Sequence, residues 1–319
     1  MNKINNTLIK DLEKATLKNI RDGFGEGLVL AGEKNKKVVA LCADLTDSTR
    51  MSFFRDEFKE RFVEIGVAEQ NLASVASGLA AVGKIPFIAS YAMFSPGRNW
   101  EQIRTTIAYN NQNVKIAGAH AGISVGPDGA THQALEDIAI MRAIPNMVVL
   151  SPCDYNEAKK MTLAVARHKG PVYFRFPREA TPVFTTVRTP FKIGRAEVFR
   201  EGSGVTIVAS GSLVYEALLA AEVTDAEVIN CHTIKPLDKE TILKSVKKTG
   251  RVVTVEEHQV NGGLGSAVAE LLVENNPVPM RRVGVRDSFG ETGEPEELLE
   301  KFGLKAKNII EAIEELNIN

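Results

Sequence analysis

Cysteine is scarce in this chain of 319 residues, which contains only Cys42, Cys153 and Cys231, far apart from one another. An odd number of isolated cysteines, with no CxxC pair, argues against a disulfide framework and against a cysteine-rich zinc site. This usage is typical of a reducing compartment, and we therefore expect a cytoplasmic protein.

An excess of charge of one sign and long apolar runs are also lacking. Lys and Arg number 39 and Asp and Glu 40, giving a formal net charge of -1, so no basic excess points to nucleic acid or to an anionic membrane. No apolar stretch is long enough to span a bilayer, and the start, MNKINNTLIKDLEKAT, has no apolar run behind a basic head, so we expect no signal peptide. The hydrophobic content of 44% nevertheless supports a sizeable core, and the length allows two domains.

Short β-branched runs alternate with helix-like segments along the chain. In the first part, strands are predicted at residues 37–42, 85–90, 114–117, 147–150 and 172–175. In the second part, the predicted strands lie near residues 205–209, 227–230, 251–255 and 281–285. The predicted helices of that part lie near residues 214–221, 239–247, 266–273, 294–301 and 307–316. Such alternation is typical of parallel sheets with helices on both faces.

A proline-containing stretch, residues 177–191, separates the two parts and is interpreted as a linker. We therefore predict an α/β fold with two doubly wound domains, residues 1–180 and 190–319, of which the second is smaller. Before the linker, Asp154 and Glu157 form a capping-box-like start for a helix that extends to about His168.

Residues 63–83, VEIGVAEQNLASVASGLAAVG, have the spacing of a helix with two distinct faces. One face is apolar and consists of Leu72, Val75, Ala76 and Leu79. The other has small side chains, which let a neighbouring backbone approach closely, and consists of Ala73, Ser77 and Ala81. Glu69 lies in the first turn, where a carboxylate commonly stabilises the helix dipole. Periodicity alone favours that role, and a functional role requires that Glu69 be buried.

Two loops that follow predicted strands carry candidate binding residues. In PFIASYAMFSPGRNWEQIR, the aromatic residues Tyr91, Phe94 and Trp100 bracket Ser95-Pro96-Gly97, and they suit either a core or stacking on a flat ring.

The second loop, GAHAGISVGPDGATHQALED, contains four glycines after a strand, and such loops bind ligands in open α/β sheets. His120, Asp128 and His132 suit a polyhydroxylated substrate and proton transfer near neutral pH. A turn-forming Asp128 and a helix-capping Thr131 are an equally good interpretation of the bare motif.

Several segments, in order along nearly the whole chain, resemble the C-terminal half of transketolases: ADLTDST, EIGVAEQN, GISVGPDGATHQALED, TIKPLD, VEEHQVNGGLGSAV and EELLEKFG. The resemblance implies a parallel-sheet pyrimidine-binding domain, residues 1–180, followed by a smaller mixed-sheet C-terminal domain, residues 190–319. The family's diphosphate-binding GDG…N segment has no true match here. The chain therefore resembles the second subunit of a split transketolase.

The resemblance also implies roles for individual residues. Glu69 matches the glutamate that contacts the aminopyrimidine ring of thiamine diphosphate, and Asp44 matches an aspartate near the cofactor at the subunit contact. The aromatic residues expected around the ring are Tyr91, Phe94 and Trp100. The residues expected to bind the sugar are His120, Asp128 and His132, with His132 also catalytic. The residues expected at the sugar phosphate are Arg21, Ser48 and Arg175.

A partial match to the missing GDG…N segment occurs at Pro127-Asp128-Gly129, which precedes Asn156 at a plausible distance. Proline replaces the first glycine, and Asn156 lies in a predicted helix start, so we do not assign a metal site there. We expect Mg²⁺ and the diphosphate to be bound mainly by an N-terminal subunit that carries GDG…N.

The expected activity is the transfer of a two-carbon ketol unit between sugar phosphates, as in the pentose phosphate pathway. We expect a heterotetramer in which two copies of this chain associate through their first domains. The alternatives are the β subunit of a 2-oxoacid dehydrogenase, an enzyme similar to deoxyxylulose-phosphate synthase, and a non-catalytic assembly partner. In the second domain, Glu256, Glu257 and His258 are interpreted as a polar loop, and residues 262–265 as a strand-to-helix turn.

Overall fold

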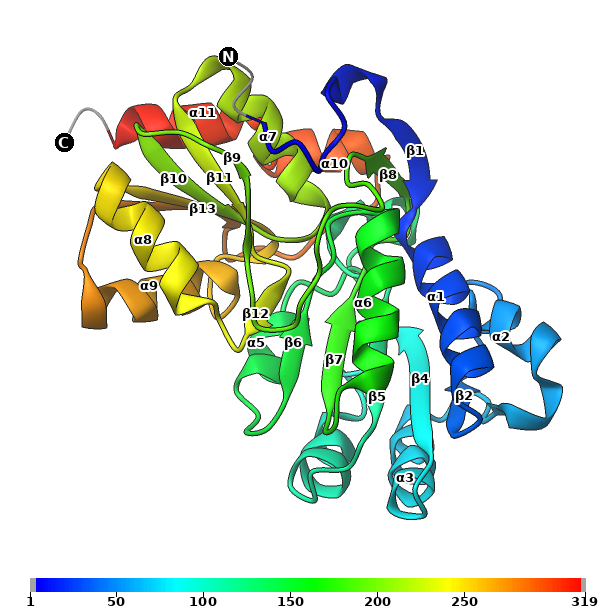
Figure 1. Cartoon of the computed structure of the whole chain (residues 1–319). Helices are drawn as coiled ribbons and strands as arrows, with labels where there is room; N and C mark the ends of the chain where they lie inside the picture. Colours follow the sequence, from blue (N-terminus) through cyan, green and yellow to red (C-terminus); the bar gives the residue numbers. More distant parts are fainter. Residues whose placement is uncertain (1–3, 317–319) are drawn as a thin grey trace.

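The computed structural model describes residues 4–316 and contains two main sheets of mostly parallel strands (Figure 1). The larger sheet has the strand order β12-β6-β7-β5-β4-β2-β3. Its parallel strands are β2 (Val38–Cys42), β3 (Phe62–Glu64), β4 (Ile85–Tyr91), β5 (Lys115–Ala119), β6 (Val148–Leu150) and β7 (Val172–Arg175). At one edge, β12 (Thr233–Lys235) pairs antiparallel with β6.

The smaller sheet has the order β14-β13-β10-β11-β9. Its parallel strands are β10 (Val205–Ala209), β11 (Ala226–Asn230), β13 (Val252–Gln259) and β14 (Met280–Val285). The edge strand β9 (Glu197–Arg200) is antiparallel. The structure thus confirms the predicted fold class, with a parallel-dominated first sheet and a smaller mixed second sheet.

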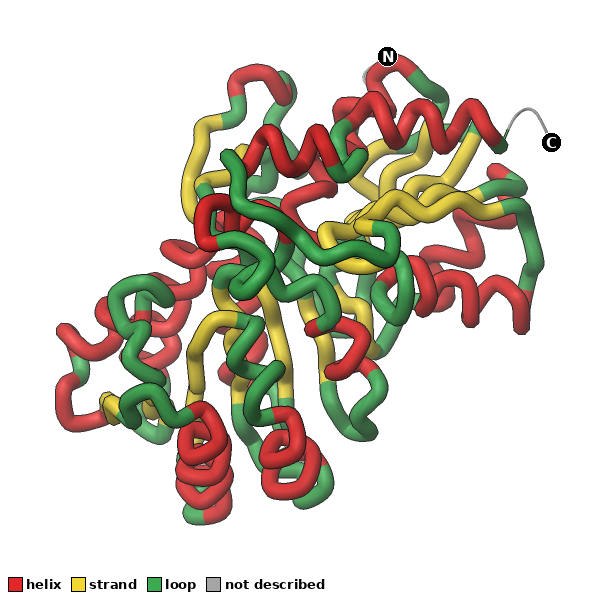
Figure 2. The backbone as a smooth tube through the Cα atoms, turned by 180° about the vertical axis from the view of Figure 1, so that it is seen from behind, coloured by secondary structure: helices red, strands yellow, loops and turns green. Residues whose placement is uncertain are grey.

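Helices cover both faces of the larger sheet, because alternate side chains of each strand point to opposite faces. On one face the core contains α1 (Ile20–Lys34), α2 (Met51–Glu57) and α6 (Tyr155–Arg167). On the other face, visible in Figure 2, it contains α3 (Glu69–Ala81), α5 (Asp137–Arg142), and the short α4 (Trp100–Gln102) with the π-helix that continues it (Ile103–Ala108). Ala73 and Ser77 of α3 are buried, and the Ser77 hydroxyl donates to the Thr106 carbonyl at 2.8 Å, so small side chains let α3 approach this π-helix.

The smaller sheet is covered in the same way. One face carries α7 (Val214–Val223), α10 (Pro295–Lys301) and α11 (Ala306–Glu315), and the other carries α8 (Lys239–Thr249) and α9 (Leu264–Asn275). Short 3-10 turns lie at Leu12–Lys14, Lys59–Arg61, Ile123–Asp128 and Gly211–Leu213. Within residues 4–316, no helix is long and apolar enough to cross a membrane.

The packing of α1 against α6 depends on glycine. A Cβ atom at Gly23 would lie 2.2 Å from the Tyr155 carbonyl oxygen, so a larger residue would push the two helices apart. The start of α6 is as the sequence predicts, since the Asp154 side chain accepts from the Glu157 amide. Such an N-cap contributes about 1 kcal/mol to stability.

The stretch 177–191 is not merely a linker. Its residues Ala180–Val183 form β8, which pairs antiparallel with β1 (Thr16–Asn19) in a third, two-stranded sheet. Nearby, the N-terminal segment lies against the smaller sheet, where the Asn5 amide donates to the Phe199 carbonyl at 2.8 Å. Local sequence could not show either contact, because both partners are distant along the chain.

The prediction of a polar loop at Glu256, Glu257 and His258 is wrong, since all three are buried in β13. The carboxylate of Glu256 accepts from the Leu264 and Gly265 amides, each at 2.7 Å, and so satisfies the N-terminus of α9. Backbone donors, rather than solvent, stabilise this charge. Residues 262–265 form the expected strand-to-helix turn.

Candidate active site

The carboxylate of Glu69, the first residue of α3, is buried and only 1% exposed. Its Oε1 accepts from the Ser90 hydroxyl at 3.2 Å, and its Oε2 accepts from Arg98 Nη1 at 2.6 Å. The Asn99 side chain donates to the Glu69 carbonyl at 2.9 Å. The burial that a functional role requires is therefore present. Arg98, which closes the exposed side of this carboxylate, was not singled out by the sequence motifs.

Four rings gather beside this carboxylate, at the carboxyl ends of β4 and β5. The Tyr91 and Phe94 rings are nearly parallel, with an interplanar angle of 19° and centroids 6.2 Å apart. His120 stacks on Tyr91 at 4.0 Å, and His132 meets the Phe94 ring edge-on at 5.4 Å. The structure thus brings together two of the three predicted aromatic residues and both loop histidines.

Trp100 takes a different position. Its indole N–H donates to the Ile140 carbonyl at 3.0 Å, and its ring packs against the core beneath α3 and α5. Local spacing could not separate this core aromatic residue from the two that face the site.

A positively charged cluster surrounds His120, whose side chain is buried and whose backbone has a φ of 52°. Arg21 Nη1 lies 3.5 Å from His120 Nε2 and donates to the Ser48 carbonyl at 2.9 Å. Burial, together with the positive charges of Arg21, Arg178 and Arg50, lowers the pKa of His120 to about 3. His120 is therefore neutral at pH 7, and the arginines supply the positive charge of the cluster.

Arg175, the last residue of β7, and Arg178, three residues further along the chain, have different environments. Arg175 is buried, and its Nε lies 2.9 Å from the buried Asp137 carboxylate. Its Nη1 donates to the Glu257 carbonyl at 2.8 Å, which ties β7 to β13. Arg178 is 33% exposed and pairs with Asp128 at 3.3 Å. Arg178 and Arg50, which sequence reasoning did not select, thus belong to the cluster, whereas Arg175 is held by structural contacts.

Asp44 and Ser48 line an open hollow of about 390 Å³ after β2. Asp44 has a φ of 58°, and its amide donates to the Glu64 carboxylate at 2.7 Å. The same carboxylate accepts from the Thr46 hydroxyl at 2.6 Å. Glu64 therefore holds the loop that presents Asp44 to the surface.

The Asp128 and Asn156 side chains are engaged separately, since Asp128 pairs with Arg178 and Asn156 donates to the Thr185 carbonyl at 2.7 Å. Across residues 4–316, no group of three His, Cys, Asp or Glu residues is placed to hold a metal ion. The half-buried rings of Tyr91 and Phe94, and a buried carboxylate whose partner Arg98 reaches solvent, do fit one flat heteroaromatic ring with a basic nitrogen.

The fold and this site define a two-domain α/β chain in which a buried carboxylate, an aromatic wall and an arginine cluster lie at the carboxyl ends of the parallel strands of the larger sheet. Family comparisons give the same class. The profile of "Transketolase, pyrimidine binding domain" matches residues 17–183, and that of "Transketolase, C-terminal domain" matches residues 194–309. The chain belongs to the transketolase family.

Individual relatives agree with the split architecture. A putative transketolase C-terminal section from Methanocaldococcus jannaschii is 47% identical, over 93% of this chain and 96% of that protein. A 6-deoxy-6-sulfo-D-fructose transketolase subunit from a Clostridium species is 45% identical, over 93% of this chain and 94% of that protein. A solved structure titled "Split gene transketolase, inactive beta4 tetramer" is 46% identical, with a TM-score of 0.88 over 93% of this chain and 98% of that one.

The relatives that would support the deoxyxylulose-phosphate synthase alternative are less similar to this chain. The 1-deoxy-D-xylulose-5-phosphate synthase of Heliobacterium modesticaldum is 38% identical, and the match covers 92% of this chain but 46% of that protein. The comparisons therefore favour a C-terminal transketolase subunit, as the sequence motifs predict.

Proposed function

We propose that this chain is the C-terminal subunit of a thiamine-diphosphate-dependent transketolase, which moves a two-carbon ketol unit from a ketose phosphate to an aldose phosphate. The observation that carries the proposal is the buried Glu69 carboxylate beside the Tyr91 and Phe94 rings. Thiamine diphosphate supplies the carbon nucleophile and electron sink for this chemistry. Pentose phosphate intermediates are the proposed substrates, in the cytoplasm.

Glu69 has the position required to hold a proton at a ring nitrogen. Its Oε1 is oriented by Ser90, and its Oε2 is held by Arg98. Because Arg98 also lies over the Phe94 ring, 4.8 Å from its centroid, binding of a flat ring against Phe94 requires this guanidinium to shift. Glu69 Oε2 would then be free to hold a proton at the ring nitrogen.

The arginine cluster suits the phosphate of the sugar. Arg21 lies 3.5 Å from His120, and the charge of Arg178 helps to keep the imidazole neutral, so His120 can donate one N–H without adding charge. Asp128 suits a sugar hydroxyl, and His132 is the candidate for proton transfer at the reacting carbons. We assign the phosphate contact to Arg178 in place of Arg175, because the Arg175 guanidinium is already engaged by Asp137.

The other half of the site is assigned to a partner. An N-terminal subunit with GDG…N would bind the diphosphate and Mg²⁺, next to the loop that carries Asp44. Two copies of this chain would associate through their first domains in a heterotetramer. The similar solved structure, an inactive tetramer by its title, supports the proposal that this chain is inactive alone.

Reconstitution tests the proposal. The purified chain is mixed with an N-terminal transketolase subunit that carries GDG…N, and ketose phosphates are assayed against pyruvate. Ketol transfer should require both chains, thiamine diphosphate and Mg²⁺. Activity of this chain alone refutes the split enzyme, decarboxylation of pyruvate favours the 2-oxoacid dehydrogenase or synthase alternatives, and inactivity of the mixture on all of them favours a non-catalytic partner.

A further inference from the structure

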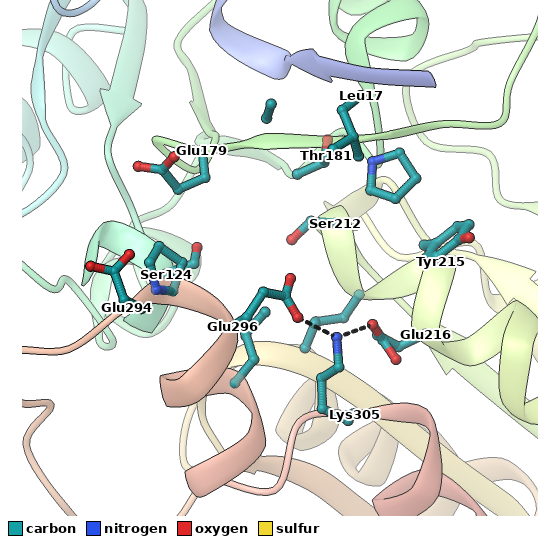
Figure 3. Close-up of a pocket in the computed structure, with 15 residues that line it drawn as sticks. Leu17, Ser124, Glu179, Thr181, Ser212, Tyr215, Glu216, Glu294, Glu296 and Lys305 are labelled. Atoms are coloured by element: carbon teal, nitrogen blue, oxygen red, sulfur yellow. Dashed lines mark hydrogen bonds and ion pairs between the residues drawn. The ribbon is translucent and has the colours of Figure 1, made fainter. Parts of the chain in front are cut away.

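The smaller domain contacts the loop that carries the candidate sugar-binding residues. This loop, residues 121–133, contains the short turn Ile123–Asp128 and is called the sugar loop below. The segment that lies against it, residues 287–295, follows β14 and leads into α10. Ser124 of the turn and Glu294 of this segment line the same cavity between the two domains, and Figure 3 shows them on the same side of it. The sugar loop is therefore packed against the other domain.

Glycines make this close contact possible. A Cβ atom at Gly126 would lie 3.2 Å from the Gly293 carbonyl oxygen, and one at Gly129 would lie 2.7 Å from Thr292 Oγ1. Gly126 and Gly129 also have φ angles of 76° and 74°, which residues with a side chain rarely adopt. The backbone of the sugar loop thus lies directly against the backbone of the segment that leads into α10.

The side-chain amide of Gln133 connects the sugar loop to this segment. Gln133 is 3% exposed, and its Nε2 lies 3.1 Å from the Ile123 carbonyl, 3.3 Å from the Gly126 carbonyl and 2.9 Å from the Glu291 carbonyl. The first two carbonyls belong to the turn, and the third belongs to the smaller domain. Because the amide nitrogen has two hydrogens, the three carbonyls share them. One buried amide therefore bonds to both sides of the contact between the domains.

A carboxylate of the smaller domain holds the beginning of the same turn. Glu257 of β13 is buried, and its Oε1 accepts from the Ser124 amide at 2.8 Å. The loop lies so close to this carboxylate that a Cβ atom at Gly122 would lie 2.2 Å from Oε1. Glu257 thus fixes the start of the turn, and the Gln133 amide fixes its two ends to one another and to the smaller domain.

The position of the turn decides where Asp128 and Arg178 lie. Arg178 Nη1 donates to the Val125 carbonyl at 3.2 Å and to the Asp128 carboxylate at 3.3 Å. Both acceptors belong to the turn, so a movement of the turn moves the guanidinium as well. Since we assign the sugar hydroxyl to Asp128 and the phosphate to Arg178, both contacts with the substrate depend on how the turn is held.

We propose that Gln133 is a positioning residue for the sugar phosphate. Its amide holds the turn against residues 287–295, in the position at which Asp128 and Arg178 meet the substrate. Gln133 acts through these two residues and does not itself contact the sugar. This inference rests on the ketol transfer proposed above and deepens it, because it gives the smaller domain a role in substrate binding.

Two variants break the bridge from opposite domains. Gln133→Met keeps the length of the side chain and removes the amide, whereas Gly290→Ala would place a Cβ atom 1.7 Å from Gln133 Oε1 and displace the amide. In the assembled enzyme, each should raise KM for the ketose phosphate about fivefold to tenfold and leave kcat within about twofold. A purely structural role would instead lower the fraction of folded enzyme, which lowers the apparent kcat and leaves KM unchanged.

Gln259→Met is the matched control. Gln259 Nε2 donates to the Ser288 carbonyl at 2.7 Å, so this change releases the same segment of the smaller domain at a point that has no bond to the turn. KM of this variant should stay within about twofold of wild type. An unchanged KM in Gln133→Met and Gly290→Ala, or an equal rise in all three variants, overturns the proposal.

Amide hydrogen exchange of the isolated full chain tests the bridge without an activity assay. Peptides that cover residues 121–135 should exchange faster in Gln133→Met and Gly290→Ala than in the wild-type chain and in Gln259→Met. If the wild-type mixture transfers no ketol unit, the proposed function fails, and hydrogen exchange still decides whether Gln133 holds the turn. Equal exchange in all four proteins overturns the positioning role in either case.

Discussion

Arg98 and Glu69 form an ion pair between a half-exposed guanidinium and a buried carboxylate. Nη1 and Oε2 lie 2.6 Å apart, with the arginine side chain 48% exposed and the glutamate side chain 1% exposed. The same guanidinium lies over the Phe94 ring. In the unassembled chain, Arg98 thus occupies the place beside Glu69 where we expect the pyrimidine ring, and this relationship leads to the first prediction.

Replacing Arg98 should destabilise the isolated chain. Arg98→Met keeps the apolar stem over Phe94 but removes the partner of a buried carboxylate. We expect a loss of about 1–2 kcal/mol in unfolding free energy, less than for a fully buried pair because Arg98 is partly solvated. Urea denaturation measures it. Arg104→Met, at an exposed arginine six residues further along, is the control, and equal stability of the two variants would contradict the role of the pair.

Glu69→Gln should reduce turnover of the assembled enzyme by at least about 100-fold, because an amide cannot take up and release the proton at the ring nitrogen. The amide is isosteric, so circular dichroism and assembly should be unchanged. Steady-state kinetics with saturating cofactor provide the measurement. Near-normal turnover of this variant or of Glu69→Ala would remove Glu69 from the mechanism.

Arg178→Met should affect the binding of phosphorylated sugars in particular. Losing one charge-assisted contact to phosphate raises KM by about 10-fold to 100-fold. An unphosphorylated aldose acceptor should show no such change, and comparing the two acceptors provides the internal control. If KM rises equally for both acceptors, Arg178 does not contact the phosphate.

Arg175→Met should act on stability. It would leave the Asp137 carboxylate, which is 1% exposed, without its cationic partner. Removing one member of such a buried pair costs about 3–5 kcal/mol. Thermal and urea unfolding should show this loss in the isolated chain. A stable Arg175→Met variant with a selectively raised KM for phosphorylated sugars would instead restore Arg175 to the phosphate site.

His120 should make the fold sensitive to acid. Burial and the neighbouring arginines lower its pKa from 6.5 to about 3, so the folded state binds a proton less readily than the unfolded state. The stabilisation from neutral His120 is therefore complete above about pH 6.5 and is lost as pH falls toward about 3. Replacing His120 by Gln should remove this pH-dependent contribution to the free energy of unfolding.

Urea unfolding of the wild-type chain and of His120→Gln should be compared at about pH 7 and about pH 4. The wild-type chain should lose more stability than the variant over this interval. Only the wild-type chain has the His120 imidazole, which takes up a proton in the unfolded state but stays neutral in the folded state. A pH-independent difference between the two proteins would show that His120 does not titrate in this way.

The sequence determined the alternation of strands and helices and the position of the main elements. The predicted strands at residues 172–175 and 205–209 coincide with β7 and β10. Such elements can be predicted because the signals for them lie within or next to the element in the sequence: its hydrophobic period and its flanking Gly, Pro and capping residues. The ordered motifs likewise sufficed to indicate the transketolase family, which the comparisons show.

Only the tertiary structure decided which side chains meet. Tyr91 and Trp100 are both aromatic residues in one loop region, yet one stacks on His120 and the other donates to Ile140 in the core. Arg175 and Arg178 are three residues apart, yet one is buried against Asp137 and the other reaches Asp128. The burial of a side chain and the residues that it contacts depend on segments that are distant along the chain. Residue type and local spacing do not contain that information.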